Sequence, residues 1–247
     1  MTYIEGFVVP VPAANRDAFR EHAEHMAGST EGFGIVRQVE AWASDVPHGK
    51  ATDFYRAVEA KEDETVVFAW FEYPSKSARD AANEKFRSDP RMAEMPPPPF
   101  DGKRMILGGF ESIVERGSGS GSYVDGFVVP VPEAKRDAYR ELAEKMAKVF
   151  QEKGATRVLE AFSDDVSHGE VTDYYRAVNA EDGEGVVFSL IEWPDKATRD
   201  EAWKAIMDDE SNRPQGEMPF DGKRMFWGGF DVIIDTASAK AAETVSA

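Results

Sequence analysis

Two histidines stand in acidic loops that recur along the chain, and an imidazole beside a carboxylate is a common pair for acid–base chemistry. His48 and His168 are 168 − 48 = 120 residues apart, and each follows an aspartate at the same distance, Asp45 or Asp165. The carboxylate can orient the ring and raise its pKa into the range that suits proton transfer. We therefore predict catalytic roles for His48 and His168. The alternative is a loop histidine that supports a turn and faces solvent.

The other two histidines have a spacing that can share a metal ion. His22 and His25 are three residues apart in a segment with helical periodicity. Leu142 and Lys145 take their places 120 residues later, and no third ligand is evident. We therefore predict a solvated helix face here and no metal site.

Arg56 and Arg176 lie in two stretches, 52–58 and 172–178, whose alternation predicts a strand. On such a face each arginine would be buried and would need a carboxylate partner. The candidate partners lie inside apolar segments and are Glu40, Glu160, Glu72 and Glu192. Trp42 alternates with the first of them and Phe162 with the second.

This set of residues has two interpretations. In the functional one, Arg56 and Arg176 are catalytic groups that hold a carboxylate or enolate oxygen at the bottom of an aromatic pocket, while a glutamate moves a proton. The ligand-binding residues are then Glu40, Glu160, Glu72, Glu192, Trp42 and Phe162. In the structural one, the arginines and glutamates form an ion cluster that fixes strand register or the interface between two repeats.

The elements that position these residues occur twice. Residues 3–115 and 123–235 align without a gap at an offset of 123 − 3 = 120, and roughly half of the positions are identical. A period of this length is a whole domain. We predict a first repeat at 1–116, a Gly/Ser linker at 117–122, a second repeat at 123–236 and a flexible tail at 237–247. The linker is either natural or inserted, in which case the chain is an engineered fusion.

Within each repeat the periodicity predicts a strand, a helix, two or three strands, a second helix and a last strand. In the first repeat the strands are expected at 3–11, 36–43, 52–58, 66–73 and 105–114, and the helices at 16–27 and 75–87. Glycines at 28 and 32 predict that the first helix ends sooner than its counterpart at 136–153. This order is typical of a ferredoxin-like α+β unit, with both helices on one face of an antiparallel sheet. Because the other face is also apolar, we predict that two ferredoxin-like repeats form an intramolecular pseudo-dimeric α+β barrel.

Composition argues against several classes of function. The net charge of −17 at pH 7 disfavours nucleic acid and anionic membranes as partners. The chain has no cysteine, which rules out disulfides and thiolate sites. We predict no signal peptide, no membrane span and a cytoplasmic location. Because the sequence has no glycine-rich phosphate loop and no nucleophile elbow, we also predict that no cofactor is used.

Several strings that recur in both repeats carry a family resemblance. In the second repeat they are YVDGFVVPVP at 123–132, DDVSHG at 164–169, TDYYRAV at 172–178 and PFDGKRM at 219–225. With these strings the chain resembles the YbaA-like bacterial family of unknown function, within the dimeric α+β barrel superfamily. The resemblance implies the barrel fold, and the superfamily includes cofactor-independent monooxygenases, isomerases, haem-handling enzymes and ligand-sensing modules. Family members are typically a single copy, so a tandem form departs from the pattern.

These observations support two hypotheses of function. In the first, the protein binds a small, partly apolar metabolite in a pocket of each half, with cofactor-free monooxygenase or isomerase-type chemistry. In the second, it is a non-catalytic interaction or structural module whose repeated Arg and Glu residues stabilise the pseudo-dimer. Further homo-dimerisation is compatible with both. A specialised function of one half is expected where the repeats differ, as they do where Leu142, Trp203 and Trp227 replace His22, Asn83 and Leu107.

Overall fold

The computed structural model describes residues 2–210 and 216–237. The first repeat contains β1 (Tyr3–Pro12), the 3-10 turn η1 (Ala13–Asn15), α1 (Arg16–Ser29), β2 (Arg37–Asp45), α2 (Phe54–Ala57), β3 (Glu64–Tyr73), α3 (Lys76–Ser88), α4 (Pro90–Ala93) and β4 (Ile106–Gly117). The second contains β5 (Tyr123–Pro132), η2 (Glu133–Lys135), α5 (Arg136–Glu152), β6 (Arg157–Asp165), α6 (Tyr174–Ala177), β7 (Glu184–Trp193), α7 (Lys196–Asp208) and β8 (Phe226–Asp235). The strands and long helices therefore follow the same order in both repeats.

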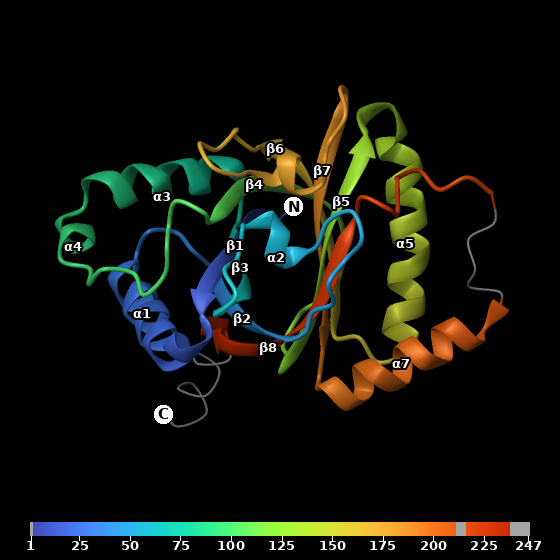
Figure 1. Cartoon of the computed structure of the whole chain (residues 1–247), viewed down its shortest axis with the longest axis horizontal. Helices are drawn as coiled ribbons and strands as arrows, with labels where there is room; N and C mark the ends of the chain where they lie inside the picture. The colour runs from blue at the N-terminus through green and yellow to red at the C-terminus, as the bar shows by residue number, and fades with distance from the viewer. Residues whose placement is uncertain (1, 211–215, 238–247) are drawn as a thin grey trace.

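Eight antiparallel strands close into one barrel in the order β1-β3-β2-β8-β5-β7-β6-β4 (Figure 1). Each repeat contributes four neighbouring strands, β4-β1-β3-β2 from the first and β8-β5-β7-β6 from the second. The repeats meet at two seams, where β2 pairs with β8 and β4 pairs with β6. Neither repeat closes the barrel alone. The prediction of an α+β barrel within one chain is therefore confirmed.

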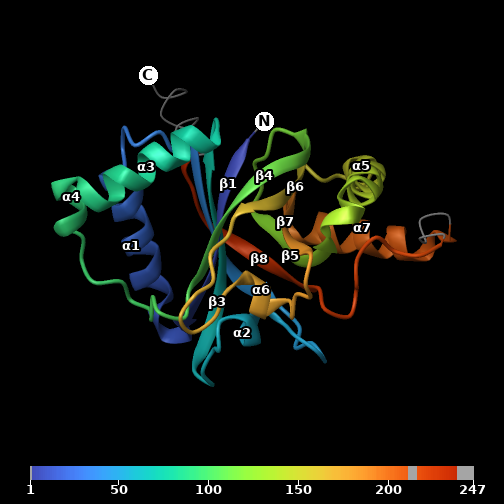
Figure 2. The same ribbon diagram turned by 90° about the horizontal axis from the view of Figure 1, so that it is seen from above.

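The long helices pack on the outside of the barrel in two groups. α1 and α3 lie on one side and α5 and α7 on the opposite side (Figure 2). α1 ends at Ser29, whereas α5 continues to Glu152, which is equivalent to position 152 − 120 = 32 of the first repeat. The prediction that the glycines shorten the first helix is confirmed, and α1 consequently covers less of the sheet than α5.

The inside of the barrel is filled with aromatic side chains. Phe68 and Phe188 are fully buried and stack with their ring centroids 4.5 Å apart. Gly6 and Gly126 leave room for them, because a Cβ on Gly6 would lie 2.7 Å from the Phe188 ring and one on Gly126 would lie 2.9 Å from the Phe68 ring. Since this interior is packed core, any ligand site must lie on the outer side of the sheet.

The prediction of a strand at 52–58 and at 172–178 is wrong. Each stretch instead enters a short helix, α2 or α6, capped by an aspartate at its N-terminus. Asp53 accepts a hydrogen bond from the backbone N–H of Arg56 at 2.8 Å, and Asp173 accepts one from Arg176 at 2.8 Å. This cap satisfies a backbone donor that the first helical turn leaves free, and it prevails over the strand-like alternation. α2 and α6 lie against each other at one end of the barrel (Figure 2).

Between the repeats, residues 117–122 lead from the end of β4 to the start of β5, and the Ser122 N–H donates to the Pro194 carbonyl at 3.1 Å. The flexible tail predicted at 237–247 lies, from residue 238 on, outside the described residues. No helix in the described part of the chain is long and apolar enough to cross a membrane.

Candidate functional site

Each repeat has a cavity between the outer face of the barrel and its two long helices. The first cavity has a volume of about 410 Å³, and its aromatic walls include Phe7, Phe19, Phe71 and Phe100. The second has about 400 Å³ and is lined by the equivalent Phe127 together with Tyr139, Phe150 and Phe220. Cavities of this size with mostly apolar walls suit small-molecule ligands.

The first cavity has a buried carboxyl group on its sheet wall. Glu40 projects outward from β2 beside a bulge between Glu40 and Ala41, and only 7% of the residue is exposed. Within residues 2–210 and 216–237 its one hydrogen-bond partner is Gln38, whose Nε2 donates to Glu40 Oε1 at 3.0 Å. Burial raises the pKa of Glu40 to about 8, although the Gln38 amide favours the ionised form. At neutral pH the carboxyl group is therefore mostly protonated and can donate a hydrogen bond into the cavity.

The equivalent carboxyl group in the second cavity has more partners. The Tyr139 hydroxyl donates to Glu160 Oε2 at 2.8 Å, and Ser189 also donates to this carboxyl group. Burial raises the pKa of Glu160, and the two hydroxyls limit the rise to about 7. Phe19 and Ala69 occupy the positions of these two hydroxyl residues in the first repeat. The acidic proton of Glu40 is consequently held more tightly, and its oxygens are less committed to protein partners.

A second polar group reaches the first cavity from the helix side. His22 lies on α1 with its ring edge toward Phe100, at a centroid distance of 6.0 Å. Its Nδ1 atom is buried and has no hydrogen-bond partner in the described part of the chain. Burial lowers the pKa of His22, so the ring is neutral at pH 7. Because Leu142 stands at this place in the second repeat, the first of these two equivalent cavities combines an acid with an imidazole and the second does not.

A third cavity, of about 340 Å³, lies where the first repeat meets a loop of the second. Its first-repeat wall includes Arg79 and Gly109, and its second-repeat wall is the loop 165–173 with His168. Five residues line both this cavity and the first one: Glu5, Asn83, Arg87, Met105 and Leu107. The two spaces are therefore adjoining parts of one cleft.

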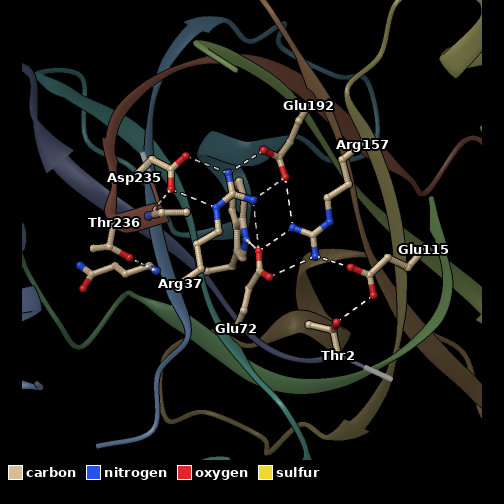
Figure 3. Close-up of polar contacts among 11 residues, drawn as sticks. Thr2, Arg37, Glu72, Glu115, Arg157, Glu192, Asp235 and Thr236 are labelled. Carbon is tan, nitrogen blue, oxygen red and sulfur yellow. Dashed lines mark hydrogen bonds and ion pairs between the residues drawn. The ribbon is translucent and has the colours of Figure 1, made fainter. Parts of the chain in front are cut away.

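An ion cluster of two arginines and four carboxylates joins the repeats (Figure 3). Arg37 pairs with Glu192 at 2.7 Å and with Asp235 at 3.0 Å. Arg157 pairs with Glu72 at 2.6 Å and with Glu115 at 2.7 Å. The pattern is symmetric between the repeats, and all four of these pairs cross from one repeat to the other.

The cluster is buried next to the aromatic core. The Trp70 indole donates to Glu72 Oε1 at 2.9 Å, and the Arg37 guanidinium lies 5.8 Å from the centre of the Trp70 ring. Burial acts to lower the pKa of Arg37, but the carboxylates of Glu192 and Asp235 more than offset it and raise the pKa above its ordinary value. Both arginines therefore stay charged, and removing one would leave buried carboxylates without their partner.

Comparisons with known proteins agree with this repeat and barrel. A family model described as "Protein of unknown function (DUF1428)" matches residues 2–102 and again 122–222. The chain belongs to the DUF1428 family. The uncharacterized protein YbaA of Escherichia coli strain K12 is 61% identical over 116 residues, which cover 47% of this chain and 99% of the relative. Uncharacterized YbaA of Shigella flexneri matches to the same extent. The predicted resemblance is confirmed, and each relative has about the length of one repeat.

Two solved structures resemble the whole DUF1428 tandem chain. A protein from Fusobacterium nucleatum, provisionally described as a monooxygenase, has a TM-score of 0.57 at 10% identity, covering 95% of this chain and 93% of its own. A protein from Lactobacillus acidophilus with the same provisional description has a TM-score of 0.52 at 9% identity, with 95% and 96% covered. At such low identity the likeness concerns the fold alone.

In this DUF1428 chain the structure separates the residues that were predicted to act together. The predicted burial of Arg56 and Arg176 is wrong. The Arg56 side chain is 55% exposed, lies 3.5 Å from Asp53 and donates to the Lys50 carbonyl, and Arg176 is similarly placed. Because α2 and α6 replace the expected strands, the side chains of these arginines point to solvent. They are not the buried partners of Glu40 or Glu72. The buried arginines that pair with glutamates are Arg37 and Arg157. The sequence could have indicated them, because an arginine stands at this equivalent position in both repeats.

The other predicted residues are divided among different places. His48 and His168 are mostly exposed and lie tilted against the rings of Tyr55 and Tyr175. They approach Asp53 and Asp173 rather than Asp45 and Asp165. Glu72 and Glu192 belong to the ion cluster. Trp42 packs on Phe19, and Phe162 lies buried 4.6 Å from the Arg136 guanidinium. Of the predicted set, Glu40 lines the first cavity, Glu160 the second and His168 the third.

Proposed function

We propose that the protein binds a small, partly apolar molecule in the first cavity and transfers a proton on it, with Glu40 as the acid–base group. The observation that carries this proposal is a buried carboxyl group with a pKa of about 8 in the wall of a cavity of about 410 Å³. A carboxyl group that titrates near neutral pH can both donate and accept a proton under ordinary conditions.

The ligand that suits this wall carries a carbonyl or hydroxyl oxygen on an apolar body. The protonated Glu40 donates a hydrogen bond to such an oxygen, while the neutral His22 Nδ1 supplies a second donor or acceptor. In its ionised form Glu40 takes a proton from the carbon next to the carbonyl and leaves an enolate, and the protonated Glu40 then returns that proton to another atom, which completes an isomerisation. Of the two predicted chemistries, isomerase-type proton transfer is the one that these groups perform between them. The likeness to the two solved structures concerns the fold and supports neither chemistry over the other.

For the second cavity we propose binding without chemistry. The oxygens of Glu160 already accept from Tyr139 and Ser189, and Leu142 replaces the imidazole. A ligand there would meet an apolar wall with one occupied carboxyl group.

A structural role for the repeated Arg and Glu residues is favoured by one separate observation. The pairs Arg37–Glu192 and Arg157–Glu72, at 2.7 and 2.6 Å, connect the two repeats inside the barrel. We propose that this cluster fixes the alignment of the repeats, which requires no ligand.

We also propose two finer points of architecture. Each repeat is a ferredoxin-like unit, supported by its strand order β4-β1-β3-β2 or β8-β5-β7-β6 with two long helices on one face. The domain bounds are 1–116 and 123–236, supported by the family matches at 2–102 and 122–222. The cytoplasmic location stays a prediction from composition.

Two matched variants test whether the first cavity binds ligand. Met26 and Met146 are equivalent, half-buried residues on α1 and α5 that line the first and the second cavity. Met26→Trp fills the first cavity and Met146→Trp the second. With the neutral dye Nile red as the probe, we expect Met146→Trp to keep the dye bound at the first cavity and Met26→Trp to lose that component. Equal dye binding by the wild type and both variants would contradict the proposal.

The proton transfer is tested with 4-phenylbutan-2-one, a neutral ketone with an apolar ring. We expect the protein to accelerate exchange of its α-protons in deuterated water, followed by NMR, and Glu40→Gln to reduce that rate by about 100-fold or more. Glu160→Gln is the matched control and should leave the rate unchanged. If the ketone displaces the dye but exchanges at the same rate with the wild type and with Glu40→Gln, the acid–base role of Glu40 is wrong.

A further inference from the structure

Building on the proposed function of the first cavity, we infer that its site extends into the third cavity and selects ligands with an apolar body and one anionic group, whose charge lies beside Arg87. The apolar part occupies the space between the sheet and α1, and the anion lies at the junction of the two repeats. The site is therefore composite, with one wall supplied by the loop 165–173 of the second repeat.

The continuity of the two spaces is the first support. Arg87, Asn83 and Leu107 line both cavities, whose volumes are about 410 and 340 Å³. The opposite wall is held in place by contacts between repeats. Arg79 Nη2 donates to Asp165 Oδ2 at 2.6 Å, and the Tyr3 hydroxyl donates to Asp164 Oδ2 at 3.0 Å.

At two of the positions that line the junction of the first and third cavities, the second repeat has larger, aromatic side chains. We call this junction the passage. Trp203 replaces Asn83, and its Nε1 donates to Asp125 Oδ2 at 2.7 Å while the ring packs on Phe150 at 5.2 Å. Trp227 replaces Leu107 and lies under the Arg199 guanidinium at 5.9 Å. In the first repeat the smaller Asn83 donates instead to Glu5 Oε1 at 3.1 Å, at the edge of both cavities. The opening is thus a property of the first repeat.

Arg79 and Arg87 line the third cavity, and they differ in whether a carboxylate of the described chain pairs with them. Arg79 is paired with Asp165, and Asp173 caps α6 and pairs with Arg176 at 3.5 Å. Burial raises the pKa of Glu5, and its carboxyl group accepts hydrogen bonds from Asn83 and Tyr73. Arg87, in the last turn of α3, has no hydrogen bond or ion pair to the described part of the chain. In a protein with a net charge of −17, an unpaired arginine over an apolar cavity selects an anion locally.

The second repeat again provides the natural comparison, because Met207 stands where Arg87 stands in the first. Arg87→Met therefore installs a side chain that the chain already uses at that position. Arg20, an exposed arginine of α1 that lines none of these cavities, is the control for a general loss of positive charge.

The test compares 4-phenylbutanoate with 4-phenylbutan-1-ol as competitors of Nile red. All proteins carry Met146→Trp, so that only the first cavity reports. We expect Arg87→Met to weaken binding of the carboxylate about three- to fivefold, as for a partly solvated ion pair, and to leave binding of the alcohol unchanged. Arg20→Met should change neither. Asn83→Trp should weaken the carboxylate more than the alcohol, because it closes the passage.

The outcomes distinguish this inference from the proposed function. If both probes displace the dye and Arg87→Met weakens them equally or not at all, the anionic selectivity is overturned while the first cavity remains a binding site. The same conclusion follows if Arg20→Met weakens the carboxylate as much as Arg87→Met. If neither probe displaces dye and Met26→Trp has no effect on it, the proposed function and this inference are both wrong.

Discussion

Glu40 makes the stability of the protein depend on pH in a way that one substitution removes. Burial raises its pKa from 4.5 to about 8 in the folded protein, whereas the unfolded chain returns it to its ordinary range. Between these two values the folded state holds a proton that the unfolded state has released. The free energy of unfolding therefore falls as the pH rises, by about 1.4 kcal/mol for each pH unit. Over 8 − 4.5 = 3.5 pH units the penalty reaches about 5 kcal/mol.

Glu40→Gln keeps the shape of the side chain but is neutral at every pH. We expect the free energy of unfolding of the variant, relative to that of the wild type, to increase by about 4 kcal/mol between pH 5 and pH 8. This is three pH units at about 1.4 kcal/mol each. The measurement is urea unfolding at pH 5, 6, 7 and 8, followed by tryptophan fluorescence. Because other titrating groups are common to both proteins, they cancel in the difference.

Glu160→Gln is the matched control, since burial and its hydroxyl partners leave the pKa of Glu160 at about 7. Its difference from the wild type should stop growing near pH 7, while that of Glu40→Gln continues to about pH 8. The reasoning about this carboxyl group is refuted if the difference in free energy of unfolding between Glu40→Gln and the wild type changes by less than about 1 kcal/mol from pH 5 to pH 8. A change of about 4 kcal/mol lies well outside the error of the linear extrapolation.

Three further predictions follow from the same structure. Phe19→Tyr gives Glu40 a hydroxyl partner like the one that Tyr139 gives Glu160, so the pKa of Glu40 should fall from about 8 toward about 7. The titration is followed by 13C NMR of the labelled Glu40 carboxyl group, and an unchanged midpoint contradicts the pairing argument. Arg37→Met leaves buried carboxylates unpaired and should lower the free energy of unfolding by about 3–5 kcal/mol, whereas Arg56→Met at an exposed site should change it by less than about 0.5 kcal/mol. Similar effects of the two would mean that the cluster is not structural. Gly6→Ala places a Cβ 2.7 Å from a buried ring and should cost about 1–3 kcal/mol in urea unfolding, while a neutral result would mean that the core yields freely.

The barrel was predictable because its signals are redundant. The repeat at an offset of 120 and the apolar strands each extend over many residues, so an error at one place does not alter the prediction of the barrel. The strand predicted at 52–58 failed for a local reason. A single hydrogen bond from the Arg56 N–H to Asp53 converts the stretch to a capped helix, and alternation over seven residues cannot outweigh it.

The site was less predictable because it depends on which groups meet in space. Glu40 and Glu160 were identified from the sequence as acidic residues in apolar strands, and their role as ligand-binding residues stays a prediction. Arg37 was not predicted as a buried ion-pair residue because it is the first residue of β2, and an arginine at the end of a strand ordinarily faces solvent. Only the second repeat, packed across the seam, buries it against Glu192 at 2.7 Å. Arg87 was missed for the opposite reason, since a cation without a partner has no spacing to recognise.

The two repeats differ at several positions that line their cavities. Both halves keep the arginine and the glutamate of the ion cluster, because each glutamate pairs with the arginine of the other half and the barrel closes only with eight strands. The second half is therefore required for the closed barrel, whether or not its cavity binds a ligand. The barrel does not constrain the second cavity in this way. The residues there are Leu142, Trp203 and Met207, at the positions of His22, Asn83 and Arg87 in the first repeat. A chain in which one copy is required for the barrel and the other carries the chemistry would be expected to diverge in this pattern.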